Sequence, residues 1–242
     1  MKKIFRKALK SLGFTITRDK RPVFLADGKP SPYCKVPLQS SKVFDLKEIE
    51  SIGDTVPGMI STQSGGHLYT LCLFQQEKGD VVEIGSWQGR STVFLAYAAK
   101  ASGNGQVWAI DHFKGNVGKE HFYVVNEKDL SDLKSGFEKN IDYAGLSEHV
   151  NLLDMPNAEA VSHIKDKSVR FLFIDGDHTR EGVLTDLRLF IPKLIDDAII
   201  VFDDFSKAFP GVVETVDEFL AEGKHSQVMS YPNTLVMRWK SN

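Results

Sequence analysis

Hydrophobic residues follow two alternating spacings from residue 81 to the C-terminus. Short apolar runs suit buried strands, and between them apolar residues recur three or four positions apart, as on the buried face of a helix. The runs predict strands at 81–84, 106–110, 150–153, 169–174 and 198–202, and a terminal hairpin at 227–231 and 234–239 around Pro232-Asn233. Helices are expected after Gly89 and near 64–76, 130–141, 158–164, 183–191 and 210–220. This alternation indicates an α/β fold with a mostly parallel sheet and helices on both faces.

The N-terminal quarter of the chain lacks this regularity. Residues 13–57 contain four prolines, Pro22, Pro30, Pro32 and Pro37, and no sustained period, so an irregular arm or cover is expected there. Residues 1–12 alternate lysine or arginine with apolar residues, as in a basic amphipathic helix. Such a helix either docks on protein or makes peripheral contact with an anionic membrane. We therefore divide the chain into an arm (1–57) and a main domain (58–242).

Composition narrows the classes of function. The net charge is −2, with 42% hydrophobic and 26% charged residues, which favours a globular protein and argues against a nucleic-acid partner. Cys34 and Cys72 are too few for a disulfide framework or a zinc site, so a reducing, cytoplasmic location is expected. No apolar run is long enough to span a membrane.

The segment VVEIGSWQGRST predicts a strand, a tight glycine turn and the start of a helix, an arrangement that lets a ligand approach backbone N–H groups. The turn departs from the dinucleotide pattern G-x-G-x-x-G, because Trp87 crowds the space for a pyrophosphate. Glu83 would repel phosphate but can bind an ammonium group, although it could also be a buried acid satisfied by backbone N–H groups. Asp111, 22 residues after Gly89, can accept ribose hydroxyls. These features favour S-adenosylmethionine as the ligand.

Four segments in order, VVEIGSWQGRST, VWAIDHF, FLFIDGDH and IIVFDDF, resemble class I S-adenosylmethionine-dependent methyltransferases. The resemblance is greatest to the catechol O-methyltransferase-like branch and its relatives that methylate sugars and natural products, and it covers roughly residues 56–239. It implies a Rossmann-like seven-stranded sheet with an antiparallel last strand.

The resemblance also implies roles for single residues. The methionine end of the cofactor would be held by the glycine turn, the ribose by Asp111, and the adenine by His112 and Asn157. A segment before the first long helix would close over the methionine carboxylate through Met59 and Ser61. The turn residues assigned to the cofactor are Glu83, Gly85, Ser86, Trp87, Gly89 and Ser91.

Three acids follow neighbouring predicted strands, namely Asp175, Asp203 and Asp204, and are expected to converge. Converging carboxylates repel one another unless a hard cation binds them, and Mg²⁺ is favoured over Mn²⁺ or Ca²⁺. The resembling family usually has Asn at the third position, where this chain has Asp204. The alternative is that Asp204 or Asp177 is a helix cap or a solvated end, and that Asp175 contacts only cofactor and substrate.

His178 lies three residues after Asp175, where the catechol branch has a lysine base, so we assign it as the general base. Asp175 or Asp177 could serve instead, or His178 could simply be exposed. The expected reaction is metal-assisted methyl transfer to a hydroxyl of a small molecule such as a sugar or natural-product glycoside. The alternative is a non-catalytic nucleoside- or sugar-binding relative, with membrane contact through residues 1–12. A nicotinamide dehydrogenase is disfavoured by Trp87. The arm before Pro57 could exchange between subunits of a homo-oligomer.

Overall fold

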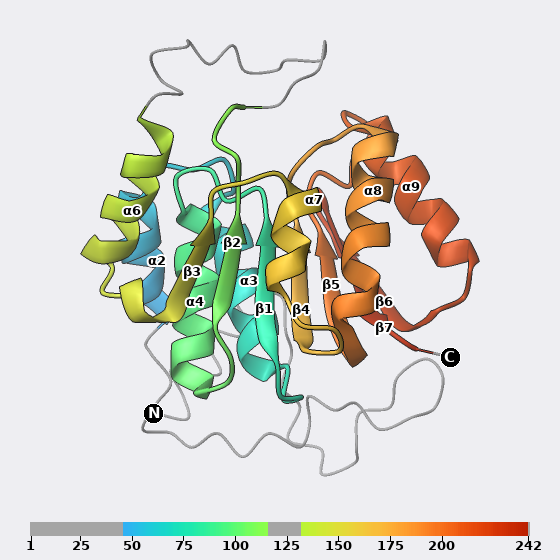
Figure 1. The fold of residues 1–242 in the computed structure, drawn as a ribbon, viewed down its shortest axis with the longest axis horizontal. Helices are drawn as coiled ribbons and strands as arrows, with labels where there is room; N and C mark the ends of the chain where they lie inside the picture. Colours follow the sequence, from blue (N-terminus) through green and yellow to red (C-terminus); the bar gives the residue numbers. More distant parts are fainter. Residues whose placement is uncertain (1–45, 116–131, 242) are drawn as a thin grey trace.

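A computed structural model describes residues 46–115 and 132–241, and within them seven strands form one sheet (Figure 1). The strands are β1 (Asp80–Ile84), β2 (Val107–Ile110), β3 (Val150–Leu153), β4 (Val169–Ile174), β5 (Leu194–Phe202), β6 (His225–Tyr231) and β7 (Thr234–Trp239). Their order is β3-β2-β1-β4-β5-β7-β6. Strands β1 to β5 are parallel, while β7 pairs antiparallel with both β5 and β6. The predicted α/β fold with an antiparallel last strand is confirmed.

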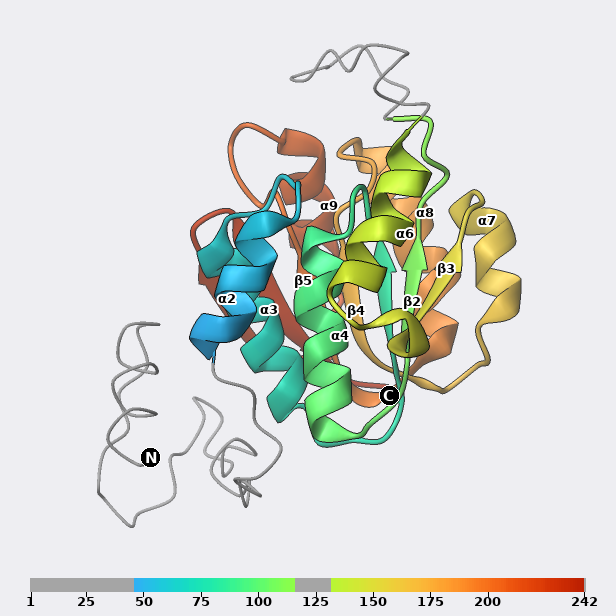
Figure 2. The ribbon, with the colours of Figure 1, turned by 90° about the vertical axis from the view of Figure 1, so that its left-hand side faces the viewer.

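The helices cover both faces of the sheet (Figure 2). One face is covered by α2 (Leu46–Thr55), α3 (Thr62–Phe74), α4 (Arg90–Ser102) and α6 (Leu133–Tyr143), and the other by α7 (Asn157–Ala160), α8 (Arg180–Phe190) and α9 (Pro210–Ala221). Alternate strand residues serve the two cores. Val81 packs in the cluster that contains Phe94 of α4, whereas Val82 packs in the cluster that contains Phe190 of α8.

The register of the four central strands determines where ligands can meet the sheet. Ile84 pairs with Ile110 on one side and with Ile174 on the other, and Ile174 pairs with Phe202. The strands therefore end level, and the residues that follow them stand side by side at one edge. The chain leaves β1 toward β2 on one side and returns to β4 on the other, which is the switch point where ligands bind in open α/β sheets.

Most element boundaries agree with the sequence pattern, and β5 is the clearest difference. The pattern predicted this strand from Ala198, but it begins at Leu194, which pairs with Val169. Asp196 and Asp197 interrupt the apolar run because they lie on an exposed stretch of the strand. Because these two residues are polar, the sequence pattern missed the first four residues of β5.

The expectation of an irregular chain up to Pro57 is wrong for residues 46–55, which form α2. Ile49 of this helix is fully buried in the same core as Phe94. Gly53 permits this packing, because a Cβ there would lie 2.4 Å from the Phe94 ring. Residues 1–45, with the predicted basic helix and Cys34, lie outside the described residues, as do 116–131. No helix in the described ranges is long and apolar enough to cross a membrane.

Candidate active site

The level ends of β1, β2, β4 and β5 open on one cavity of about 1410 Å³. Residues that follow each of these strands line it, and so do the starts of α7 and α8. Most of the ionisable side chains in the lining are acids. The sequence-predicted residues in this lining are Met59, Gly85, Ser86, Trp87, Ser91, Asp111, His112, Asn157, Asp175, His178, Asp203 and Asp204.

The turn after β1 is built on left-handed backbone angles. Gly85, Trp87 and Gly89 have φ values of 86°, 47° and 93°. A Cβ at Gly85 would lie 2.0 Å from the backbone oxygen of Asp175. The missing side chain thus lets the ends of β1 and β4 approach each other, and the expected access of a ligand to the turn stays a prediction.

Glu83 is fully buried beneath this turn. Its Oε2 accepts a hydrogen bond from the Thr92 hydroxyl, whereas its Oε1 and the buried Ser86 hydroxyl have no hydrogen-bond partner among the described residues. Burial raises the pKa of Glu83 to about 7, opposed by the nearby hydroxyl groups of Ser91, Thr92 and Ser86. The alternative of satisfaction by backbone N–H groups is not what the structure shows. Two orphaned polar atoms next to Ser91 fit a ligand that brings hydrogen-bond donors.

Asp111 is held by two backbone N–H groups. Its Oδ2 accepts from Trp87 N at 2.8 Å and its Oδ1 from Phe113 N at 2.7 Å. Each carboxylate oxygen keeps a further lone pair, so the side chain can still accept two hydroxyl groups from the cavity. The neighbouring His112 accepts a hydrogen bond from Lys114 N through its Nδ1.

The segment before α3 reaches the cavity beside the turn. Met59 lines the cavity and is 55% exposed. Ser61 is not among the lining residues, since its hydroxyl accepts from Ser64 N at 3.0 Å and caps α3. The segment is tied to α4 by Arg90, whose Nε donates to Val56 O at 2.7 Å and whose Nη1 donates to Ile60 O at 3.0 Å.

Asp175, His178 and Asp204 converge, with one ligand atom from each within 4.8 Å of the others. His178 Nε2 lies 2.9 Å from Asp204 Oδ2 and 4.0 Å from Asp175 Oδ1. Asp204 has a φ of 52°, a left-handed conformation that is rare outside glycine and concentrates at functional sites. The His178 ring packs on Phe209, with 4.6 Å between centroids.

Asp203 lies beside this cluster but is not part of it. Its Oδ1 accepts a hydrogen bond from the Thr234 hydroxyl at 3.1 Å. Asp203 lines the same cavity as Asp175 and Asp204, and its charge acts on Asp175, so its role as a third ligand stays a prediction. Asp203 and Asp204 lie in the turn after β5, where Asp204 has a left-handed backbone, and their side chains contact different residues. The sequence pattern could not show that Asp204 alone lies next to His178.

The acids raise one another's pKa values. Burial raises the pKa of Asp175 well above its usual range, and the charges of Asp203 and Asp204 raise it further. Burial followed by the Asp204 charge raises the pKa of Asp203 to about 6. A cluster of oxygen donors that resists ionisation by itself fits a divalent cation, whose charge would offset this repulsion.

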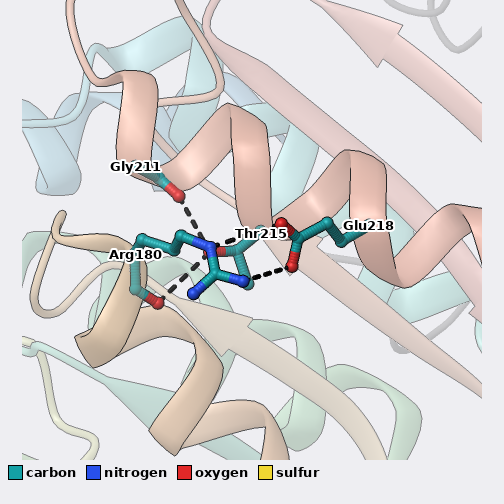
Figure 3. Close-up of polar contacts among 4 residues, drawn as sticks. All are labelled: Arg180, Gly211, Thr215 and Glu218. Atoms are coloured by element: carbon teal, nitrogen blue, oxygen red, sulfur yellow. Dashed lines mark hydrogen bonds and ion pairs between the residues drawn. The ribbon is translucent and has the colours of Figure 1, made fainter.

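The start of α8, which carries His178 into the site, is held from behind by α9 (Figure 3). The Thr215 hydroxyl bridges the carbonyl oxygens of Arg180 and Gly211, and Arg180 Nη2 pairs with Glu218 at 2.7 Å. A Cβ on Gly211 would lie 2.7 Å from the carbonyl oxygen of His178. The two helices are therefore in direct backbone contact behind the acidic cluster.

The cavity residues that sequence reasoning missed include two buried or partly buried charged side chains, Arg90 and Asp186. The only sequence signal for Arg90 was its position directly after Gly89 in the turn. Asp186 offered a stronger signal, because it lies at the position of the apolar stripe Val183, Leu187 and Phe190 where a further apolar residue is expected.

Comparisons with known proteins agree with this geometry. The family described as "Methyltransferase domain" matches residues 82–205, just over half of the chain. A curated relative, the 8-demethyl-8-(2,3-dimethoxy-α-L-rhamnosyl)-tetracenomycin-C 4'-O-methyltransferase of Streptomyces olivaceus, is 23% identical over 171 residues. That match covers 64% of this chain and spans 64% of the relative's length.

Solved structures share the fold at low identity. The O-methyltransferase NovP is 20% identical with a TM-score of 0.63, and the match covers 83% of this chain and 90% of NovP. An O-methyltransferase from Bacillus cereus in complex with SAH is 18% identical with a TM-score of 0.57, covering 86% and 93% of the two chains. These matches cover a larger share of the chain than the family segment does.

Proposed function

The chain belongs to the methyltransferase-domain family of S-adenosylmethionine-dependent enzymes, and from that premise we propose that it methylates a hydroxyl group of a small molecule with the help of a divalent cation. The observation that carries the proposal is the order of groups along the level strand ends. Glu83, a buried acid with an unpaired oxygen, lies in β1, and Asp111, which can accept hydroxyl groups, follows β2. The cluster of Asp175, His178 and Asp204 follows β4 and β5.

The cofactor would lie across the ends of β1 and β2. Glu83, Ser86 and Ser91 would hold its aminoacyl end, because two orphaned oxygens there match an ammonium donor. Asp111 would accept the ribose hydroxyls, with His112 and Asn157 at the base, and Met59 would cover the methionine end. Ser61 stays a prediction for this role. When bound, S-adenosylmethionine supplies the methyl group.

The divalent cation would be held by Asp175 and Asp204, with Asp203 adding negative charge beside them. Mg²⁺ is favoured because the carboxylates offer hard oxygen donors, and Mn²⁺ or Ca²⁺ would also suit them. A bound cation lowers the pKa of an acceptor hydroxyl and orients its oxygen.

His178 is proposed as the general base. Its Nε2 is the ring nitrogen that faces the two carboxylates, so a proton taken from the acceptor hydroxyl would be stabilised by Asp204 at 2.9 Å. Phe209 packs on the ring, and α9 supports the backbone behind it. The chain's own contribution is thus to align the acceptor oxygen and take its proton.

A small acceptor fits the cavity better than a polymer. Its volume of about 1410 Å³ exceeds the roughly 300–1,000 Å³ of a typical ligand pocket, which leaves room for an acceptor beside the cofactor. The acid-rich lining would repel nucleic-acid phosphates. Because the curated relative is named for a 4'-O-methylation of a rhamnosyl natural product, we propose a sugar hydroxyl on a natural-product glycoside as the acceptor class.

Calorimetry with S-adenosylmethionine and S-adenosylhomocysteine tests the cofactor. We expect one cofactor to bind per chain with a sub-millimolar dissociation constant, and NAD to bind far more weakly because Trp87 lines the turn. Absence of binding by both S-adenosyl compounds would reject the proposal.

The cation is tested separately by chelation. With sugar-bearing acceptors, turnover should be lost in EDTA and restored by Mg²⁺, and the Asp204→Asn variant should need a higher Mg²⁺ concentration. Turnover that persists in EDTA would remove the cation from the proposal and leave cofactor binding intact.

A further inference from the structure

Asp186 is a buried carboxylate that neither the methyl-transfer chemistry nor the acidic cluster uses. It is 3% exposed and lies on the inner side of α8, one position before the buried Leu187. Its Oδ1 accepts a hydrogen bond from Asn157 Nδ2 at 2.6 Å, and its Oδ2 has no hydrogen-bond partner among the described residues. A buried acceptor without a donor is costly, so its retention calls for a ligand that supplies one.

Asp186 and Asn157 lie at one end of the same cavity. Both line it, beside the apolar side chains of Pro156, Ala158 and Leu189. This end adjoins the start of α7, which follows β3, and β3 lies beyond β2 in the sheet. A ligand whose ribose meets Asp111 after β2 would therefore extend its base toward Asn157 and Asp186. Apolar walls with a few polar groups suit a flat heteroaromatic ring.

The hydrogen bond between the two side chains determines the orientation of the Asn157 amide. An aspartate oxygen accepts, so the amide nitrogen of Asn157 must face Asp186 and its carbonyl oxygen is left to accept from the cavity. Asp186 Oδ2 is a second acceptor, and it lies 3.6 Å from where a Cβ on Gly176, another cavity residue, would be. Burial raises the pKa of Asp186 to about 7, and the Asn157 hydrogen bond opposes this rise. An exocyclic amino group, which has two N–H donors, matches this pair of acceptors.

We propose that Asp186 is a positioning residue for the cofactor base, which orients Asn157 so that the pair recognises the 6-amino group of adenine. The inference rests on the proposed function, since it takes an S-adenosyl compound as the ligand. It adds to that function a reason why the site prefers adenine over a purine with a 6-oxo group. The 6-oxo oxygen is a hydrogen-bond acceptor and would face the acceptor oxygens of Asn157 and Asp186.

Binding of S-adenosylhomocysteine and S-inosylhomocysteine, measured by calorimetry, tests the proposal. The wild type should bind the adenine compound at least about 100-fold more tightly, the cost of one unpaired buried polar contact. Asp186→Asn keeps the shape but lets either amide face the base, so the preference should fall to less than about tenfold. Glu159→Gln makes the same chemical change on the exposed side of α7 and should keep the preference.

If Asp186 had a purely structural role, Asp186→Asn would weaken the binding of both compounds equally or of neither. A preference for the adenine compound that is retained in Asp186→Asn overturns the inference. Thermal unfolding should show the variant folded, and Asp186→Ser replaces it if it is not. A wild type that binds S-adenosylhomocysteine without preference also overturns the inference and leaves the proposed function standing. A wild type that binds neither compound overturns both.

Discussion

At the scale of single residues, the acids of the site are held in different ways. Asp111 receives two backbone N–H donors, which fix the orientation of its carboxylate where a ribose would lie. Glu83 is buried with one hydroxyl donor, and burial raises its pKa to about 7. When Glu83 is ionised and unpaired, its burial lowers the stability of the cofactor-free protein. An ammonium group that pairs with the carboxylate would remove this cost, so cofactor binding would stabilise the protein.

The first prediction concerns the pH dependence of stability. The pKa of Glu83 is raised from 4.5 in the unfolded reference to about 7 in the folded chain, so its stabilising contribution is present below pH 4.5 and is lost as pH rises through 7. The free energy of unfolding of the cofactor-free protein should fall by about 3 kcal/mol over this window from Glu83 alone. Denaturant unfolding at pH 5 and pH 8 measures it. Glu83→Gln should flatten the dependence, and an unchanged slope would refute the assignment.

The second prediction concerns the base. His178→Gln should lower kcat by about 10² to 10⁴ because no group then takes the hydroxyl proton. The dissociation constant of S-adenosylhomocysteine should change little, since the proposed cofactor position is at the ends of β1 and β2. The control is His163→Gln, which replaces an exposed histidine that is not among the residues lining the cavity. A His178 variant with wild-type kcat would exclude this residue as the base.

The positions of site residues were predictable from the sequence only where a strand end determined them. Asp111 and Asp175 follow apolar runs directly, so their place at the sheet edge follows from the strand itself. The grouping of Asp203 with Asp204 as metal ligands stays a prediction, and the left-handed backbone at Asp204 and the Thr234 contact of Asp203 could not be predicted from the sequence. Asp186 was missed because the helix pattern was counted by its apolar members alone.

At the scale of elements, the site depends on close backbone contacts between neighbouring segments. The end of β1 meets the backbone of Asp175 at Gly85, and the start of α9 meets the backbone of His178 at Gly211. These contacts position Asp175 and His178 through their backbone and leave their side chains free to face the cavity. The Arg180–Glu218 pair adds little because both side chains are about half exposed.

The third prediction tests the contact between α8 and α9. Alanine in place of glycine usually stabilises a helix, but at Gly211 the new Cβ would lie 2.5 Å from Arg180 N. Gly211→Ala should lower the free energy of unfolding by about 1–3 kcal/mol through overpacking and should reduce turnover by moving His178. Gly136→Ala in α6, where the nearest atom is 3.5 Å away, should be neutral or stabilising by about 0.5–1 kcal/mol. Thermal unfolding of both variants measures the contrast, and equal stability would argue against this contact.

Helix α2 shows why one element escaped sequence analysis. Ser51 and Gly53 weaken its helical pattern, and a nearby proline marks its end. Gly53 is required because the Phe94 ring packs against it, and Gly65 of α3 contacts the same ring. The reason for both glycines lies in α4, far along the chain, so local patterns gave no indication of it.

At the scale of the whole molecule, the order of strands in the sheet brings residues from distant parts of the sequence together at one edge. Each strand end contributes one or two groups, and the order β2-β1-β4-β5 arranges them as the proposed ribose acceptor, the proposed aminoacyl site and the acidic cluster. The alternation of strands and helices was sufficient to predict this architecture. The acceptor was not predictable, because no readable pattern marks the segments outside the sheet.

The central claim is that an S-adenosyl cofactor lies across the ends of β1 and β2, and a crystal structure with S-adenosylhomocysteine tests it most directly. The account predicts the homocysteine end beside Glu83 and Ser91, both ribose hydroxyls on Asp111, and the adenine beside Asn157. Density for the compound at another edge of the sheet, or with its ribose away from Asp111, would contradict it.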